Sequence, residues 1–117
     1  QDASYGKNIY YAESFKSVEE NFAEFQGVKL VRGKLPGTLK NEKLEKIGFL
    51  HVDLNAPEIE TECVRALWDR ILPGGVILID DYAYSGFQYT TTLFNTMSQE
   101  LGVSILTTAS GQGIIVK

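Results

Sequence analysis

Cysteine and histidine each occur only once in this sequence, as Cys63 and His51. A single cysteine excludes an internal disulfide and a multi-cysteine zinc site, and a single histidine excludes a metal site built from several histidines. We interpret Cys63 as a small buried hydrophobic residue and His51 as a core residue of a buried strand. This cysteine usage is consistent with a cytoplasmic protein.

Long apolar runs and a leader-like start are also lacking. The longest uninterrupted apolar stretches, such as residues 76–79, are far shorter than the roughly 20 residues that a membrane-spanning helix needs. No charged segment followed by an apolar one opens the chain, so no signal peptide is visible. Because the first residue is Gln1 rather than Met, we expect the chain to be a fragment of a longer protein.

Positive charge is scarce in the second half of the chain. Residues 47–117 contain 3 Lys or Arg against 8 Asp or Glu, whereas residues 1–46 contain 8 against 7. Such an acidic half is a poor surface for the phosphate backbone of a nucleic acid, which we therefore do not expect as a partner. A bound cation is easier to accommodate.

Hydrophobic periodicity and turn residues predict one α/β domain over residues 1–117. The length of 117 residues, with 44% hydrophobic and 22% charged residues, fits a single globular domain. Two nearly continuous apolar runs with a helix between them predict parallel central strands joined by a crossover. The expected helices span 14–26, 39–46, 57–72 and 86–101, and the expected strands span 28–31, 47–52, 76–79, 103–107 and 113–116, the last two forming a hairpin around Gly111.

Three local signals fix the ends of these helices. Ser14 is expected to cap the first helix, and Pro57 suits the first position of the helix that begins there. The turn at residues 73–75, Pro-Gly-Gly, is expected to terminate that helix. Its apolar stripe is expected to consist of Ile59, Cys63, Leu67 and Ile71, widened by Val64 and Trp68.

Acidic side chains follow both central strands. Asp53 comes directly after the strand over 47–52, and Asp80 and Asp81 follow the strand over 76–79. Neighbouring strands lie about 5 Å apart, and ligands of open α/β sheets bind at the carboxyl ends of the strands. Three carboxylates there would repel each other, and a hard divalent cation such as Mg²⁺ would remove the conflict. The pattern therefore predicts a metal site made of Asp53, Asp80 and Asp81.

Each acidic motif alone has a simpler explanation. An Asp before a helix often only caps it, and Asp-Asp often begins a turn. The two motifs together, separated by one helix, favour the metal site. A phosphoacceptor receiver domain also combines an acidic cluster with Mg²⁺, but its paired acids come before the lone Asp, and its late-strand Lys would have to be the terminal Lys117. We therefore set that alternative aside.

A longer stretch of sequence is similar to a known enzyme family. Residues 49–82, FLHVDLNAPEIETECVRALWDRILPGGVILIDDY, resemble the core of the macrocin O-methyltransferase family, whose members methylate sugar hydroxyls. The shared features are the first Asp, an Ala-Leu pair in the helix, the Pro-Gly-Gly turn and the Asp-Asp-Tyr ending. Residues 13–39 are similar to the preceding helix, strand and turn of the family, with Leu35 where Phe is usual. The likeness spans residues 13–117.

The resemblance implies a fold, a methyl donor and a metal. It implies the C-terminal portion of the Rossmann-like sheet of class I methyltransferases, with S-adenosylmethionine as donor and Mg²⁺ or a similar cation. Catechol O-methyltransferase places its metal ligands similarly, which extends the ligand role to Asp53, Asp80 and Asp81. The turn Gly33-Lys34-Leu35 would border the adenosine side of the donor.

The resemblance also implies an acceptor, a hydroxyl of a small molecule or sugar. Tyr82 and Tyr84, with Phe87, are candidates for contacting this acceptor, or else they pack beneath a loop. The family's second acid, implicated as general base, is Asn55 here, and its Tyr is Pro57. Because an asparagine side chain cannot accept a proton in this role, the identity of the base stays open.

The family's Gly-rich cofactor loop lies upstream of everything that aligns. We therefore expect this chain to lack the first strand-helix-strand unit, so that catalysis depends on such a unit in the parent protein. Without it the strand over 47–52 has an exposed edge, which predicts a homo-oligomer formed through that edge. Two functions stay open, a Mg²⁺-dependent O-methyltransferase and a truncated, non-catalytic relative that acts as a binding or self-association module.

Overall fold

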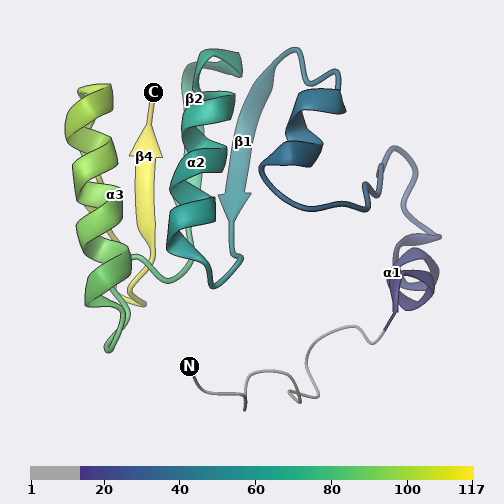
Figure 1. Ribbon diagram of the computed structural model, residues 1–117, viewed down its shortest axis with the longest axis horizontal. Helices are drawn as coiled ribbons and strands as arrows, with labels where there is room; N and C mark the ends of the chain where they lie inside the picture. The colour runs from purple at the N-terminus through teal and green to yellow at the C-terminus, as the bar shows by residue number, and fades with distance from the viewer. Residues whose placement is uncertain (1–13) are drawn as a thin grey trace. The chain divides into compact units, whose positions relative to one another are not determined.

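The computed structural model describes residues 14–117, and the chain divides into two compact units between Gly33 and Lys34. The described part of the first unit contains one helix, and the second contains a four-stranded sheet with its helices (Figure 1). Among the described residues, no helix has both the length and the apolar character needed to cross a bilayer. The expectation of one domain over residues 1–117 stays a prediction.

The helix of the first unit, α1 (Phe15–Phe22), begins where the sequence predicts. Ser14 is its N-cap, and the Ser14 hydroxyl accepts a hydrogen bond from the backbone N–H of Ser17 at 3.2 Å. The helix ends before residue 26, because the chain turns after Phe22 and reaches Gly27 with a φ of 88°. The predicted strand over 28–31 is wrong, because these residues form no strand and are not part of the sheet that the structure describes.

The sheet of the second unit contains one parallel pair of strands and two antiparallel pairs. β1 and β2 pair in parallel, as predicted, with Val52 opposite Ile79. β4 is antiparallel to β2 and to β3, which confirms the predicted C-terminal hairpin. β1 and β3 are therefore the two edges of the sheet. The strand order is β1 (Ile47–Val52), β2 (Ile71–Ile79), β4 (Gly113–Val116) and β3 (Leu106–Thr107).

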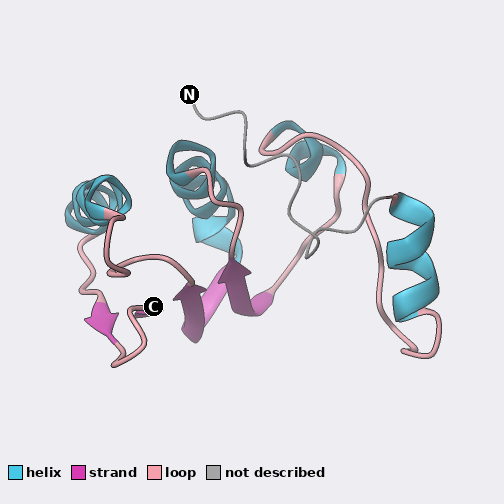
Figure 2. Cartoon of the chain, turned by 90° about the horizontal axis from the view of Figure 1, so that it is seen from below, coloured by secondary structure: helices cyan, strands magenta, loops and turns pink. Residues whose placement is uncertain are grey.

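Helices α2 (Pro57–Leu67) and α3 (Gln88–Leu101) lie on the same face of the sheet (Figures 1 and 2). α2 connects β1 to β2 and has Pro57 at its first position, as predicted, and the 3₁₀ turn η3 (Trp68–Arg70) follows it. The helix expected over 39–46 is wrong in extent. A shorter 3₁₀ helix, η2 (Gly37–Asn41), takes its place directly after Pro36.

The buried stripe of α2 differs from the predicted one at its first turn. Ile59 is 37% exposed, whereas Glu60 and Thr61 are buried. The predicted spacing of four residues per step drifts about 40° around an α-helix at each step, so it cannot stay on one face. The residues that do face the core follow spacings of three and four. They are Glu60, Thr61, Cys63, Val64 and Leu67.

The Pro-Gly-Gly turn lies inside β2 and does not end the helix. The register between β1 and β2 shifts between Ile47 and Phe49. Ile47 is opposite Ile71 and Phe49 is opposite Val76, so β2 has additional residues in this interval. Gly75 is required within this irregularity, because a Cβ there would lie 2.8 Å from the carbonyl oxygen of Leu72. The turn therefore bends the start of the strand that later carries Asp80.

The core lies between the sheet and the two helices, and the other face of the sheet is open. No helix of residues 34–117 lies on that face (Figure 2), and Phe49 and Val116 are 61% and 55% exposed there. Phe49, Val76 and Val116 form one row across β1, β2 and β4. The residues of the core include Val52, Val64, Ile77, Ile79, Phe94, Met97 and Ile115.

We predict that the chain self-associates through the outer edge of β1, which pairs with no strand of residues 14–117, since an unpaired strand edge is a template for another strand. Phe49→Lys, which puts a charge on this edge strand, should shift the protein towards monomer in size-exclusion chromatography with light scattering. Val116→Lys is the matched control, because Val116 is in the same row but on a strand paired on both sides. A wild-type monomer at all concentrations would contradict the prediction, and equal dissociation by both variants would assign association to the open face instead.

Candidate metal centre

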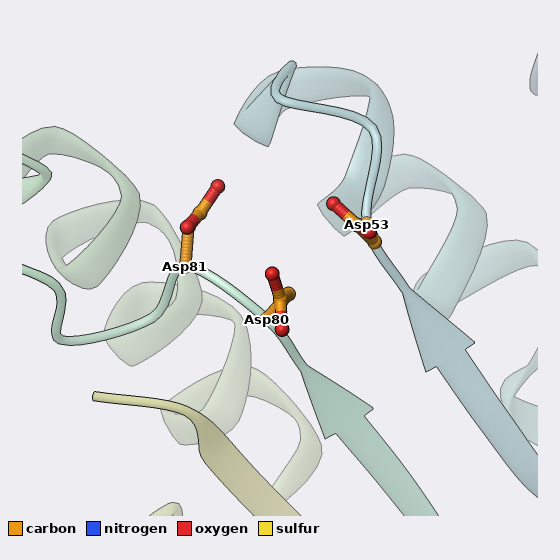
Figure 3. A group of neighbouring side chains, drawn as sticks. All are labelled: Asp53, Asp80 and Asp81. Carbon is orange, nitrogen blue, oxygen red and sulfur yellow. The ribbon is translucent and has the colours of Figure 1, made fainter. Parts of the chain in front are cut away.

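The three predicted acids meet at one corner of the sheet. Asp53 follows β1 and Asp80 follows β2, and the N–H of Asp80 donates to the carbonyl of Val52 at 3.0 Å, which continues the parallel pairing past the strand ends. One carboxylate oxygen from each of Asp53, Asp80 and Asp81 lies within 4.8 Å of the other two (Figure 3). We call these three residues the acidic corner.

The spacing of the acidic corner suits a divalent cation. Two oxygens on opposite sides of one ion lie about 4.2 Å apart for Mg²⁺ and up to about 5 Å apart for Ca²⁺. Three oxygens within 4.8 Å of one another are therefore close enough to share one such ion after small side-chain rotations. Asp53 is exposed while Asp80 and Asp81 are half-buried, so the corner is open to solvent on the Asp53 side.

The carboxylates destabilise each other in the charged form. Burial raises the pKa of Asp81, and the neighbouring charges of Asp80, Asp53 and Glu60 raise it further. Two cations of the second half of the chain have other partners. Arg65 binds Glu100, and Lys117 donates to the carbonyl oxygen of Trp68.

The loop after β1 is held by Glu60, a residue that the sequence did not single out. Glu60 is 4% exposed, and its Oε1 accepts hydrogen bonds from the backbone N–H groups of Leu54 at 2.9 Å and Ala56 at 3.3 Å. Asn55 between them has a φ of 52°. The N-cap of α2 is Ala56, without a side-chain cap, so the explanation of Asp53 as a helix cap is wrong. A Glu in the first turn of a helix was the available signal, but Glu58 and Glu60 share it.

On the other side of the corner, Gln112 contacts Asp80. Gln112 Nε2 donates a hydrogen bond to Asp80 Oδ1 at 3.0 Å, from 32 residues away in the sequence. No sequence signal marked Gln112, because only the antiparallel pairing of β4 with β2 brings it there.

His51 is not in the core, which corrects the interpretation from sequence. Its neighbours Leu50 and Val52 face the helices, so the alternation of a strand turns His51 to the open face. Its side chain is 45% exposed, and its Nε2 lies 4.0 Å from Asp80 Oδ1.

An apolar cavity of about 300 Å³ borders the acidic corner at Asp53. Of the three predicted cofactor-binding residues, only Leu35 lines it. Lys34 uses its backbone carbonyl to accept hydrogen bonds from Thr38, and Gly33 belongs to the other unit. The cavity is lined by Leu35, Leu39, Leu50, His51, Val52, Asp53, Leu54, Cys63 and Leu67.

Cys63 is buried in α2, as predicted, and forms part of the cavity wall. Burial raises the pKa of its thiol, and the charges of Glu62 and Glu60 raise it further. The thiolate is therefore disfavoured, which fits a packing residue rather than a nucleophile.

The predicted acceptor residues divide into a packing residue and an exposed one. Tyr82 is buried in the core, its hydroxyl donates to Asn95 Oδ1, and its ring packs against Gly113. We therefore assign Tyr82 a packing role. Tyr84 is 58% exposed, and its ring meets that of Phe87 edge-on at 5.9 Å.

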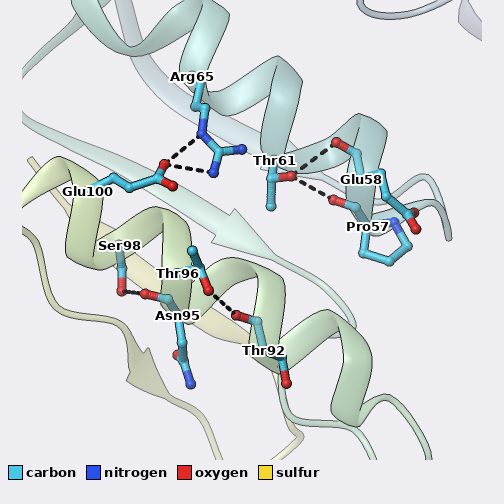
Figure 4. A network of polar contacts seen from close by, with 9 residues as sticks. All are labelled: Pro57, Glu58, Thr61, Arg65, Thr92, Asn95, Thr96, Ser98 and Glu100. Carbon is cyan, nitrogen blue, oxygen red and sulfur yellow. Dashed lines mark hydrogen bonds and ion pairs between the residues drawn. The ribbon is translucent and has the colours of Figure 1, made fainter.

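The two helices beneath the corner are tied together at their far ends. Arg65 of α2 donates from Nε and Nη2 to one oxygen of Glu100 on α3, at 2.9 and 2.7 Å (Figure 4). Because both side chains are exposed, this ion pair contributes at most about 1 kcal/mol to stability. The buried contacts of Val64, Phe94 and Met97 therefore hold the helices against the sheet.

Comparison with known proteins gives one family. The family described as Macrocin-O-methyltransferase (TylF) matches residues 1–102. No individual curated protein matches the chain. The family match includes the whole acidic corner and ends before Gln112.

We predict that Asp81→Asn raises the melting temperature by a few degrees at pH 7 in the absence of divalent cations. Since the folded-state pKa of Asp81 lies above its usual value of 3.8, stability falls as pH rises from that value through the folded-state pKa and stays low above it. The rise in melting temperature caused by Asp81→Asn should therefore be smaller near pH 4 than at pH 7. Melts followed by circular dichroism in EDTA test this, with the exposed Asp69→Asn as control; an unchanged or lower melting temperature at pH 7 would contradict it.

Glu60→Ala should lower the free energy of unfolding by about 2 kcal/mol or more, because it leaves two backbone N–H groups without their acceptor. Urea unfolding measures the change. Glu62→Ala on the exposed side of the same helix should stay within about 0.5 kcal/mol of wild type. Equal effects of the two substitutions would show that the loop after β1 does not depend on Glu60.

Proposed function

The chain belongs to the macrocin O-methyltransferase family, whose model matches residues 1–102, and we propose that it takes part in a cation-dependent transfer of a methyl group from S-adenosylmethionine to a hydroxyl of a small molecule or sugar. The observation that carries this proposal is the acidic corner, where three carboxylates from two adjacent strand ends lie within 4.8 Å.

The topology around the corner supports the same proposal. β1, α2 and β2 form a strand-helix-strand unit with parallel strands, and the corner is at their carboxyl ends, where ligands of α/β sheets bind. We propose that this sheet is the C-terminal portion of a Rossmann-like methyltransferase sheet. A cofactor-binding unit that pairs along the free edge of β1 would complete it.

The acids would hold Mg²⁺ or a similar ion, and Asp53 would present it towards solvent. A cation at this point supplies the Lewis acidity that lowers the pKa of an acceptor hydroxyl. Asn55 stands beside Asp53 and has no proton-accepting group, so the hydroxyl proton would leave to another group or to water. Tyr84, exposed beyond the corner, is the remaining aromatic candidate for contacting the acceptor.

We propose the apolar cavity beside Asp53 as the binding site of the methyl donor. Leu35 and Leu39 form one wall and Leu50 and Leu54 line it from β1 and its loop, which suits an aromatic base better than a charged group. Asp53 belongs both to the lining of this cavity and to the acidic corner, so it lies between the two proposed binding sites. Fixing the sulfonium methyl in line with the hydroxyl oxygen would supply much of the rate acceleration.

A second candidate function is a non-catalytic relative that keeps the fold and the cation. Asn55 in the position of the family's general base favours it, as does the free edge of β1. The two candidates differ in whether this chain binds the methyl donor.

Titration calorimetry with S-adenosylhomocysteine, with and without Mg²⁺, tests the proposal. We expect binding of S-adenosylhomocysteine and, separately, binding of Mg²⁺ that Asp80→Asn weakens by tenfold or more, since removing one of three carboxylates removes a ligand. Asp69→Asn is the matched control. Absence of S-adenosylhomocysteine binding under both conditions would rule out catalysis by this chain alone and favour the non-catalytic candidate.

A further inference from the structure

The turn between β3 and β4 carries a chain of polar side chains that ends on Asp80. Thr108 Oγ1 lies 2.9 Å from Ser110 Oγ, and Ser110 Oγ donates to Gln112 Oε1 at 3.2 Å. Gln112 Nε2 then donates to Asp80 Oδ1 at 3.0 Å. The backbone N–H of Gln112 also binds Thr108 Oγ1, at 3.1 Å. The Gln112 side chain is therefore held at both ends of its amide.

The direction of these hydrogen bonds follows from the proton count. A serine hydroxyl has one proton, and that of Ser110 is used on Gln112 Oε1, so Thr108 is the donor in the Thr108–Ser110 contact. With its oxygen occupied by Ser110, the amide must turn its NH₂ group towards Asp80. The reverse orientation would place an amide oxygen against a carboxylate.

A second contact fastens the same turn to the chain just after the acidic corner. The N–H of Ala83 donates to the carbonyl of Gly111 at 2.7 Å. Gly111 has a φ of 90°, and a Cβ there would lie 3.1 Å from the backbone of Tyr84. A residue with a side chain would be strained in this conformation and would push the turn away.

We propose that Gln112 is a positioning residue for Asp80, which it orients so that its carboxylate faces Asp53 and Asp81. This inference rests on the proposed function, because it takes the acidic corner as a cation site. It goes beyond the family match, which ends at residue 102.

The chemistry of an amide suits this role better than that of a cationic side chain. Like charges at Asp53 and Asp81 push the Asp80 carboxylate away, so a fixed donor is needed to keep it at the corner. A Lys or Arg in place of Gln112 would also bind Asp80, but it would supply the positive charge that the cation brings. Gln112 orients the Asp80 carboxylate and leaves its negative charge available to a cation. His51, at 4.0 Å from the same oxygen, is too distant for a hydrogen bond.

The test compares cation binding by wild type, Gln112→Leu and Gln99→Leu, using Mn²⁺ alone as the probe. Gln99 is exposed on α3, so its substitution makes the same chemical change away from the corner. We expect calorimetry to give a dissociation constant 10- to 100-fold higher for Gln112→Leu and unchanged for Gln99→Leu. The electron paramagnetic resonance spectrum of Mn²⁺ bound at saturation should change only in Gln112→Leu, because the ligand shell loses its fixed carboxylate.

The outcomes separate the two proposals. Wild type that binds no Mn²⁺ would overturn the cation site itself. Wild type that binds Mn²⁺ with the same affinity and spectrum as Gln112→Leu would overturn only the role of Gln112. If Gln112→Leu fails to fold, Ser110→Ala replaces it, since it keeps the Gln112 donor but removes the contact that orients it; a several-fold weaker affinity supports the proposal, and an unchanged affinity contradicts it.

Discussion

The parallel pairing of β1 with β2 is the constraint on which the site depends. With Val52 opposite Ile79, the residue that follows each strand is an aspartate, and both aspartates leave the sheet at the same edge. The pairing is held by side chains that face the helices, with Val52, Ile77 and Ile79 buried against α2 and α3. A shift of one residue along the strand would turn these apolar side chains to the open face. The packing of the core therefore also fixes the register of the acids.

The surroundings of the acidic corner orient its side chains without neutralising them. Glu60 holds the loop after Asp53 through two backbone N–H groups and adds a further negative charge nearby. Gln112 holds Asp80 through an uncharged amide, and Arg65 is engaged with Glu100. Neither Glu60 nor Gln112 carries a positive charge, so the repulsion among the three acids lowers the free energy of unfolding. That cost is easiest to understand if the corner serves to bind a cation.

The chain belongs to the macrocin O-methyltransferase family. The residues that fit the family's pattern and those that differ from it lie in different parts of the site. By the resemblance of residues 49–82, the acids at positions 53, 80 and 81 fit the family's pattern, and they are the residues that the ends of β1 and β2 bring together. The departures, at Asn55 and Pro57, are in the loop and the first turn of α2, where backbone geometry is set by Glu60 and by the ring of Pro57. The acids of the proposed cation site and the residues that differ from the family's pattern are therefore separate sets of side chains in this chain.

The elements whose signals are local could be predicted from the amino-acid sequence. The apolar runs before Asp53 and Asp80, the cap at Ser14, Pro57 at a helix start and the hairpin around Gly111 all depend on residues within a few positions, and the structure has them. The meeting of the three acids was also predictable, because one helix between two apolar runs implies parallel neighbours. The remaining features depend on contacts between distant parts of the folded chain. Residues 28–31 joined no strand of the described sheet, His51 lies on the sheet face that no helix of residues 34–117 covers, and Gln112 reached Asp80 through a pairing that spans 32 residues. These outcomes depend on which surfaces meet, and contacts between residues distant in the sequence leave no periodic or local mark in it.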